Sequence, residues 1–280
     1  MNKILVTGAS GNIGAPLVEA LRASGADFEV MRSKAVVGSA AHVASFSDVP
    51  SLQKAFAGID TLFVLLPLVP NKLQFARNVA QAAKAARVKH IVRTSGAGAD
   101  PQAAFALPQL QGSIDQVFGD TGIATTFLRP AGFMQNYSGY MAGMVRAGTV
   151  YGATADAPQS LIDVRDIAAV AATVLTNPQA HAGKAYTLTG SEALTDSQRT
   201  QILSDVLGRT VNFVEVSQEA GTASMVQMGM PPSIVEWLSS LNALIAAGYA
   251  GAVSLDVQDL LGRPAIGFRQ FAHDFQGALL

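Results

Sequence analysis

Residues 4–14 read Ile-Leu-Val-Thr-Gly-Ala-Ser-Gly-Asn-Ile-Gly, a short apolar run followed directly by glycines 8, 11 and 14. Gly8 would let the chain turn sharply off a strand, Gly11 would let backbone N–H groups approach a pyrophosphate, and Gly14 would let the next helix pack closely on a sheet. That helix would direct its unpaired N–H groups and the positive end of its dipole at the phosphates. The stretch therefore predicts a dinucleotide-binding turn.

The residues around this turn decide between a cofactor site and an ordinary β-turn-α unit, because a chain with 26 glycines among 280 residues produces such spacings by chance. An apolar run at 4–6 predicts a strand before the turn. Ile13, Leu17 and Leu21 follow at intervals of four, the apolar stripe of a helix that lies on a sheet. The context favours the cofactor site.

The end of the second expected strand should select the cofactor. An acidic residue at this position usually holds the ribose 2′-hydroxyl of NAD, whereas the 2′-phosphate of NADP requires a cation. Residues 28–34, Phe-Glu-Val-Met-Arg-Ser-Lys, offer Arg32 and Lys34. A guanidinium binds phosphate with two parallel hydrogen bonds. NADP(H) is therefore favoured over NAD(H), although a solvated loop with two basic residues is the alternative.

Composition narrows the class of protein. The chain has a net charge of −1 and no run of Lys or Arg, so it lacks the electrostatic footprint of a nucleic-acid-binding protein. It has no cysteine and only four dispersed histidines, which predicts no metal site and suits the reducing cytoplasm. Its apolar runs are too short to span a bilayer. We expect a cytoplasmic protein that binds a small aromatic or conjugated molecule, without membrane or nucleic acid; a homodimer is compatible with the sequence.

Strand and helix patterns alternate up to residue 190, which predicts an α/β fold with a doubly wound parallel sheet of the Rossmann type. Expected strands are 3–7, 28–32, about 42–45, 61–66, 89–95, 124–129 and 185–189, and expected helices 12–24, 50–57, 72–87, 108–121 and 164–177. We expect a domain at 1–190 that includes a pocket segment at 130–160. A smaller, mostly helical lobe at 191–280 would cover the substrate, beginning with a capped helix from Thr195 to about residue 207.

Several separate segments of the chain form a recognisable set. They are 7–14, Thr-Gly-Ala-Ser-Gly-Asn-Ile-Gly; Ser51-Leu52 with 55–58, Ala-Phe-Ala-Gly; 88–92, Val-Lys-His-Ile-Val, with Thr94-Ser95; 127–130, Phe-Leu-Arg-Pro; 133–136, Phe-Met-Gln-Asn; 163–168, Asp-Val-Arg-Asp-Ile-Ala; and 202–209, Ile-Leu-Ser-Asp-Val-Leu-Gly-Arg. Together these segments, which extend over about residues 1–215, resemble the NmrA-like group of atypical short-chain dehydrogenases/reductases, and within it reductases of quinones, azo compounds and triphenylmethane dyes.

The resemblance implies a cofactor site that can be placed residue by residue. The pyrophosphate would lie on residues of the first turn, the 2′-phosphate on Arg32 with Lys34 beside it, and the nicotinamide half on residues after the fourth, fifth and sixth strands. The implied residues are Gly8, Ser10, Gly11, Asn12 and Ile13 for the pyrophosphate, Leu65, Leu66 and Pro67 on the adenosine-side ribose and toward the nicotinamide, Thr94, Ser95 and Gly96 at the nicotinamide ribose, and Pro130 to Phe133 over its ring.

The chain departs from ordinary short-chain dehydrogenases in its proton donor. Those enzymes use Tyr-x-x-x-Lys, in which the lysine lowers the pKa of the tyrosine. No tyrosine here has a lysine four residues later. Many NmrA-like enzymes carry His, Lys or Glu near the nicotinamide on the helix after the fifth strand, and the comparable stretch here, at 110–115, reads Leu-Gln-Gly-Ser-Ile-Asp. Candidate catalytic residues are Tyr137, Gln111 and Ser95.

Without a strong acid or base, the acceptor must tolerate negative charge, or start positive, until solvent protonates it. We therefore expect an NADPH-dependent reductase of a conjugated acceptor such as a quinone, a dye, or an activated carbonyl or iminium. A non-catalytic NADP(H)-binding redox sensor is the alternative, and a biosynthetic ketoreductase or isomerase that uses water or Tyr137 as proton source is a further one.

Overall fold

The computed structural model describes residues 2–35 and 41–280, and contacts divide the chain into two units. The first unit comprises residues 1–104, 108–129 and 167–187, and the second comprises 105–107, 130–166 and 188–280. The expected division into 1–190 and 191–280 stays a prediction; the contacts group residues 130–166 with the second unit.

A seven-stranded sheet forms the centre of the first unit, with the strand order β3-β2-β1-β4-β5-β6-β8. The pairs from β3 through β6 are parallel. The order reverses between β1 and β4, which is the switch point of a doubly wound sheet, where ligands bind at the carboxyl ends of the strands. The strands are β1 (Ile4–Val6), β2 (Phe28–Arg32), β3 (His42–Val43), β4 (Thr61–Val64), β5 (His90–Thr94), β6 (Ala124–Pro130) and β8 (Ala185–Leu188).

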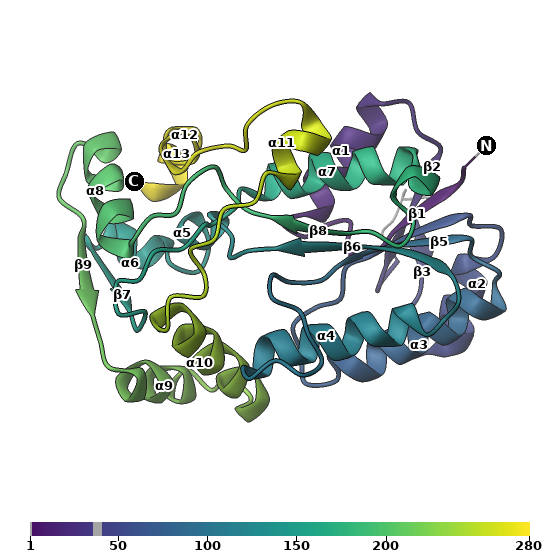
Figure 1. Ribbon diagram of the computed structural model, residues 1–280, viewed down its shortest axis with the longest axis horizontal. Helices are drawn as coiled ribbons and strands as arrows, with labels where there is room; N and C mark the ends of the chain where they lie inside the picture. The colour runs from purple at the N-terminus through teal and green to yellow at the C-terminus, as the bar shows by residue number, and fades with distance from the viewer. Residues whose placement is uncertain (1, 36–40) are drawn as a thin grey trace. The chain divides into compact units, whose positions relative to one another are not determined.

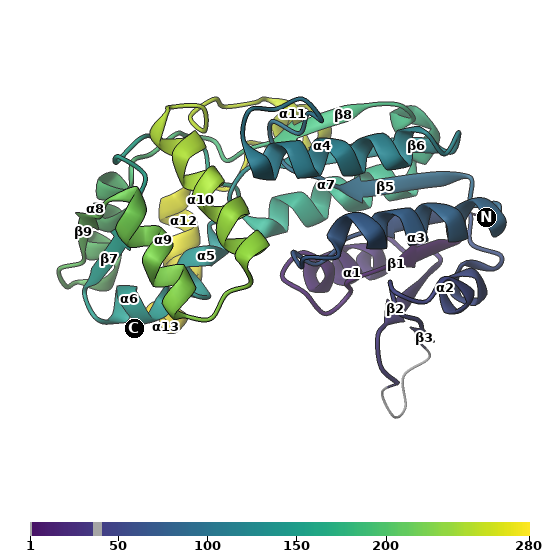
Figure 2. The same ribbon diagram turned by 90° about the horizontal axis from the view of Figure 1, so that it is seen from below.

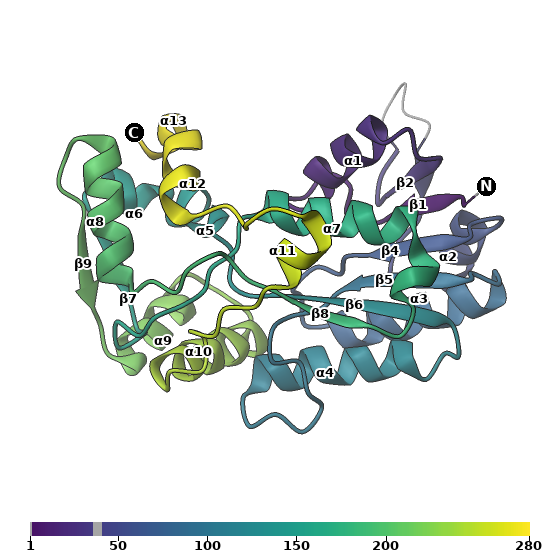
Figure 3. The ribbon, with the colours of Figure 1, turned by 45° about the horizontal axis from the view of Figure 1, so that its top comes forward.

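Helices cover both faces of this sheet. Figures 1 and 3 show α1 and α7 over one face and α2, α3 and α4 over the other, and Figure 2 looks onto the face that carries α3 and α4. The helices are α1 (Gly14–Ala23), α2 (Val49–Phe56), α3 (Lys72–Ala85), α4 (Ala106–Gly119) and α7 (Val164–Thr176), with a 3-10 turn at Pro178–His181. The doubly wound α/β class predicted from the sequence is confirmed.

The apolar residues of these strands and helices are buried at the positions that the sequence pattern predicts. Every residue of β1, β4 and β5 is buried, as expected for parallel strands covered on both faces. Leu17 and Leu21 of α1 are fully buried, so the apolar stripe at intervals of four packs on the sheet.

The second unit has its own core and a small parallel sheet of two strands, β7 (Thr149–Gly152) and β9 (Asn212–Glu215), which the sequence patterns did not reveal. Its core includes Met134, Tyr137, Leu203, Phe268 and Phe271. The helices are α5 (Gln135–Ser138), α6 (Ala142–Arg146), α8 (Asp196–Leu207), α9 (Gln218–Gln227), α10 (Pro232–Ala246), α11 (Asp256–Leu261), α12 (Phe268–Asp274) and α13 (Gln276–Leu279).

The predicted capped helix near residue 195 is confirmed as α8. The Thr195 side chain accepts from the N–H of Gln198, and the Gln198 side chain accepts from the N–H of Thr195, a complete capping box. Gly208 ends the helix in the left-handed conformation, with φ of +65°. Within the residues that the structure describes, no helix has both the length and the apolar character needed to cross a membrane.

A buried histidine links β5 to β6. The Thr126 hydroxyl donates to the carbonyl of His181 at 2.7 Å, so its oxygen is left to accept from Nε2 of His90 at 2.9 Å. Burial, together with the nearby His181, lowers the pKa of His90 to about 4. The folded protein therefore holds His90 in its neutral form.

His90 should make the protein sensitive to acid. The unfolded chain takes up a proton on this residue at a higher pH than the folded chain does, so stability is lost as the pH falls from about 6.5 to about 4. His90→Gln keeps an N–H donor without titrating, and we expect it to reduce that loss by about 2–3 kcal/mol. Urea unfolding at pH 7 and pH 4.5 measures it. The exposed His273→Gln is the control, and an unchanged pH dependence in His90→Gln would contradict the assignment.

Candidate functional site

The turn after β1 brings two backbone segments into direct contact. Gly8 adopts φ of +69°, which favours glycine, and its carbonyl accepts from the N–H of Gly11 at 3.0 Å. A Cβ on Gly14 would collide with the carbonyl oxygen of Gly8. Any side chain at position 14 would therefore push α1 away from the turn, which makes glycine obligatory there.

The start of α1 is open to a ligand. Ile13 is its N-cap residue, and no side chain caps the helix. Ser10, Gly11 and Asn12 are exposed just before it. The first N–H groups of a helix need partners, and an anion can supply them.

Arg32 ends β2 at the same edge of the sheet, because Val30 of β2 and Val6 of β1 are in register. Arg32 is half-buried, and its Nε is buried without a hydrogen-bond partner among the described residues. Lys34, two residues later, is exposed. A buried guanidinium N–H without an acceptor is costly, so this position suits an anionic group.

The end of β4 is tied to the end of β1. Thr7 donates its N–H to the carbonyl of Phe63 at 3.1 Å, and its side-chain oxygen accepts from the N–H of Leu65 at 2.9 Å. Leu65 lies against Gly8, where an added Cβ would meet its side chain at 3.0 Å. Leu66 is buried and Pro67 exposed. The residues expected to border the dinucleotide after β4 therefore begin beside the glycine turn.

Two hydroxyl groups at the end of β5 have no hydrogen-bond partner in the described part of the chain. Thr94 and Ser95 are buried, at 7% and 6% exposure, and neither Thr94 Oγ1 nor Ser95 Oγ has a hydrogen-bond partner within residues 2–35 and 41–280. Gly96 follows them and is half-buried. Native proteins rarely bury a hydroxyl unpaired, so a ligand at this edge would satisfy both.

These features fit a dinucleotide. In a doubly wound sheet the dinucleotide crosses the switch point, with one half over β1 and β2 and the other over β4 and β5. The glycine turn and the open start of α1 suit the pyrophosphate, Arg32 suits a 2′-phosphate, and Thr94 and Ser95 suit a ribose.

A buried ionic network lies between β5 and α4. Arg93 forms an ion pair with Asp115, and it donates from Nη2 to Oε1 of Gln111 at 2.7 Å. Arg129 donates to the other oxygen of Asp115 from Nε at 3.2 Å and Nη2 at 3.1 Å. Arg93 is 1% exposed, and burial followed by the nearby Arg129 lowers its pKa. Asp115 therefore forms ion pairs with two guanidinium groups, one at each carboxylate oxygen.

Lys72, the first residue of α3, adds a third cation to this region. It is 5% exposed, and none of the described residues forms a hydrogen bond or an ion pair with its ammonium group. Burial, followed by repulsion from Arg93, lowers the pKa of Lys72 to about 7. Two carboxylates act on these basic groups: Asp115, which pairs with both arginines, and Asp100, whose charge acts on Arg129.

The remaining predicted residues belong to the second unit. Pro130 is buried and Phe133 half-buried. The Tyr137 hydroxyl donates to Oδ1 of Asp196 at 2.6 Å and accepts from Nε of Arg199 at 2.9 Å, and burial raises its pKa. The role of Tyr137 as proton donor stays a prediction that this environment disfavours, because both hydrogen-bonding capacities of the hydroxyl are occupied.

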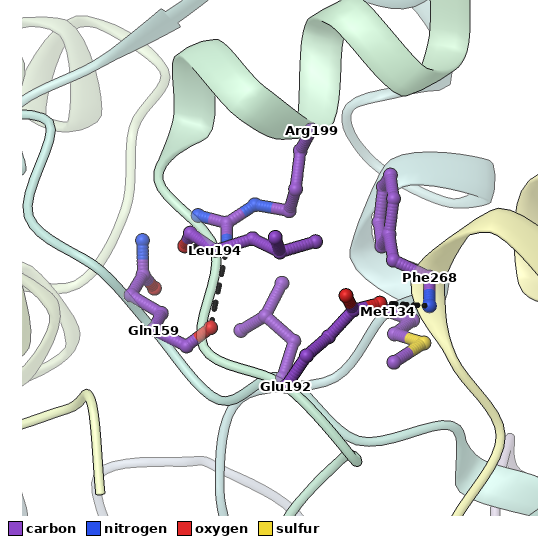
Figure 4. Close-up of a pocket in the computed structure, with 7 residues that line it drawn as sticks. Met134, Gln159, Glu192, Leu194, Arg199 and Phe268 are labelled. Carbon is purple, nitrogen blue, oxygen red and sulfur yellow. Dashed lines mark hydrogen bonds between the residues drawn. The ribbon is translucent and has the colours of Figure 1, made fainter.

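The second unit also contains a small recess beside this tyrosine network (Figure 4). Leu194, Met134 and Phe268 line it together with Arg199, which donates to the carbonyl of Leu194 at 2.5 Å. Its volume is about 10 Å³, the space of one water molecule. This recess does not accommodate a conjugated substrate.

Sequence reasoning missed the partners of the network. Arg93 interrupts a buried strand, since Ile91, Val92 and Thr94 around it are all buried. A charge in such a run must find a partner. A charged residue within a buried strand was therefore visible in the sequence as a sign of a buried partner. The identity of the partners, Asp115 and Gln111, depends on how α4 packs on the sheet.

Comparison with known proteins agrees with this geometry. The family described as "NmrA-like family" matches residues 1–251. A protein named NAD(P)H azoreductase from Xenophilus azovorans is 34% identical over 276 residues, covering 96% of each chain. The chain belongs to the NmrA-like family. The family resemblance predicted from the sequence segments is therefore confirmed.

Solved structures extend the comparison to cofactor complexes. An NADPH-dependent quinone oxidoreductase from Escherichia coli, solved with NADPH, is 26% identical with a TM-score of 0.87 and covers 98% of this chain and 99% of its own. A triphenylmethane reductase from Citrobacter, solved with NADP(H), is 28% identical with a TM-score of 0.84 and covers 98% and 99%. Both share the fold of this member of the NmrA-like family over nearly its whole length.

Arg32 should determine the preference for a 2′-phosphate. Arg32→Ala removes the unpartnered guanidinium, and we expect it to weaken NADPH binding about 10- to 100-fold, as loss of a charged hydrogen bond does. NADH binding should change less than about threefold. Titration calorimetry with both nucleotides measures this. Arg22→Ala, which removes an exposed cation of α1, is the control, and equal losses for NADPH and NADH would contradict the prediction.

Lys72 should reduce stability at neutral pH. With its pKa lowered to about 7 in the folded state, the unfolded chain binds its proton more readily between pH 7 and pH 10.5, so stability rises with pH across that window. Lys72→Met should stabilise the protein by about 2–4 kcal/mol at pH 7 or below, and the gain should vanish near pH 10.5. Urea unfolding from pH 7 to pH 10 measures it, with the exposed Lys84→Met as control. A gain that does not depend on pH would refute this explanation.

Proposed function

We propose that this chain is an NADPH-dependent reductase that transfers hydride to a small conjugated acceptor. The observation that carries the proposal is that three buried polar atoms at the carboxyl ends of β2 and β5 have no hydrogen-bond partner among the described residues: Arg32 Nε, Thr94 Oγ1 and Ser95 Oγ. They flank the glycine turn, in which the start of α1 packs directly against the backbone of Gly8. This combination suits a dinucleotide with a 2′-phosphate.

The relatives support the same activity. One relative is named an NAD(P)H azoreductase, and two solved relatives are named a quinone oxidoreductase and a triphenylmethane reductase. These names point to acceptors with conjugated π systems, so we propose that substrate class for this chain.

The side chains explain why the acceptor should be conjugated. The stretch at 110–115, comparable to the one that carries His, Lys or Glu near the nicotinamide in many NmrA-like enzymes, has Gln111 and Asp115 instead, and Asp115 pairs with two arginines. Ser95 and Gln111 can donate hydrogen bonds but are weak acids. We therefore propose that the product keeps its negative charge by resonance until water protonates it, and that acceleration comes from holding the reactants about 3–3.5 Å apart.

The setting of the enzyme is also a proposal. We propose that it works in the cytoplasm on small aromatic or conjugated molecules and without nucleic acid, as its balanced charge and lack of cysteine suggest. A homodimer stays a prediction, which light scattering after size exclusion would test.

A panel of acceptors tests the function. The purified protein is mixed with NADPH and a quinone, an azo compound, a triarylmethyl dye or a plain ketone, and loss of the reduced nicotinamide absorbance is followed. We expect turnover of the conjugated acceptors and none of the plain ketone. Gly14→Ala should abolish both NADPH binding and turnover, since its Cβ collides with Gly8. Gly119→Ala, at the end of α4 with open space around it, is the matched control.

Two outcomes would contradict this function. Tight NADPH binding without turnover of any acceptor would favour a redox sensor. Turnover of plain ketones that is lost in Tyr137→Phe would show that a side chain supplies the proton.

A further inference from the structure

The side-chain amide of Gln111 has a defined orientation. Guanidinium groups have only donors, so the atom of Gln111 that lies 2.7 Å from Nη2 of Arg93 must be the carbonyl oxygen Oε1. The amide nitrogen Nε2 then points away from Arg93. Gln111 therefore presents N–H donors, and no acceptor, on its other side.

That donor lies beside the end of β5. A Cβ built on Gly96 would lie 3.3 Å from Cγ of Gln111 and 3.6 Å from its Nε2. Gly96 directly follows Ser95, whose hydroxyl is buried without a partner. The N–H groups of Gln111 are thus placed at the edge of the sheet where the nicotinamide half of a dinucleotide lies.

Arg93 is held in place to orient this amide. It is almost completely buried, and its ion pair with Asp115 fixes the guanidinium. Asp115 and Gln111 are four residues apart and lie on the same face of α4. A hydrogen bond accepted from a cation also polarises the amide, which strengthens its N–H groups as donors.

Basic side chains gather near Arg93, which holds the amide. Arg93 and Arg129 share Asp115, Asp100 also acts on Arg129, and Lys72 has no partner among the described residues. The N–H groups that Gln111 presents stabilise negative charge that develops on a ligand, and they offer no acceptor to a ligand that carries positive charge.

Taking the proposed function as given, we propose that Gln111 is the donor that stabilises negative charge on the acceptor, and that Arg93 positions it. The site then selects neutral or anionic acceptors, such as quinones and azo compounds, over cationic dyes. A quinone that takes a hydride gains two electrons and one proton to become a hydroquinone monoanion, and solvent adds the second proton while NADPH becomes NADP⁺. A triarylmethyl cation becomes neutral instead, so it leaves no anion for Gln111 to stabilise.

The test compares menadione, a neutral quinone, with crystal violet, a triarylmethyl cation, at saturating NADPH. Gln111→Met keeps the length of the side chain without the donor. We expect it to lower kcat about 10- to 100-fold with menadione and less than about threefold with crystal violet, with NADPH affinity unchanged. Gln109→Met, an exposed position on the same helix, should match the wild-type protein with both acceptors.

A double-mutant cycle tests the positioning role. Arg93→Lys keeps a cation beside Asp115 but loses the fork that holds Oε1 of Gln111, and should lower kcat with menadione about 3- to 10-fold without raising KM in proportion. Arg93→Lys combined with Gln111→Met should be no slower than Gln111→Met alone, since both changes remove one interaction. A merely structural role would make the two losses multiply.

The outcomes separate this inference from the proposed function. Equal losses with menadione and crystal violet, or no loss in Gln111→Met, would overturn the inference while the reductase activity stands. Losses that multiply in the double variant would overturn the role of Arg93. A wild-type protein that oxidises NADPH with neither acceptor would overturn the proposed function, and the inference with it.

Discussion

The contact between the backbone of α1 and the carbonyl of Gly8 is the constraint on which the site depends. No side chain fits at position 14, and Gly8 needs a left-handed backbone conformation to make the turn. Because of this close approach, α1 begins directly after the turn that follows β1, and no side chain caps its first N–H groups. The helix start is thereby available to an anion at the point where the strand order reverses.

Parallel strand pairing places the other residues of the site at the same edge of the sheet as the glycine turn. Because β2, β1, β4 and β5 pair in parallel, their carboxyl ends lie at one edge. Arg32, Thr94 and Ser95 therefore lie at this edge, and each has a buried polar atom without a hydrogen-bond partner among the described residues. Their desolvation is offset only when a ligand supplies the missing partners, so ligand binding and local stability are coupled.

Buried charged residues beside the site limit the chemistry that this member of the family can carry out. Helix α4 carries an amide, Gln111, and a carboxylate, Asp115, and the carboxylate binds two arginines. An amide held by a cation can donate a hydrogen bond but cannot release a proton at neutral pH. The chemistry that remains is hydride transfer to acceptors that delocalise charge.

The sequence by itself determined the seven strands of the main sheet, its helices and the glycine turn, because apolar periodicity and glycine geometry are local properties of the chain. It also placed Arg32 at the end of its strand and predicted a capped start for α8. Only the tertiary structure decided that Arg93 meets Gln111 and Asp115, that Lys72 is buried, and that Tyr137 binds Asp196 and Arg199. The paired residues lie 18 to 62 positions apart in the sequence. They arise from packing between elements, on which local propensity and periodicity carry no information.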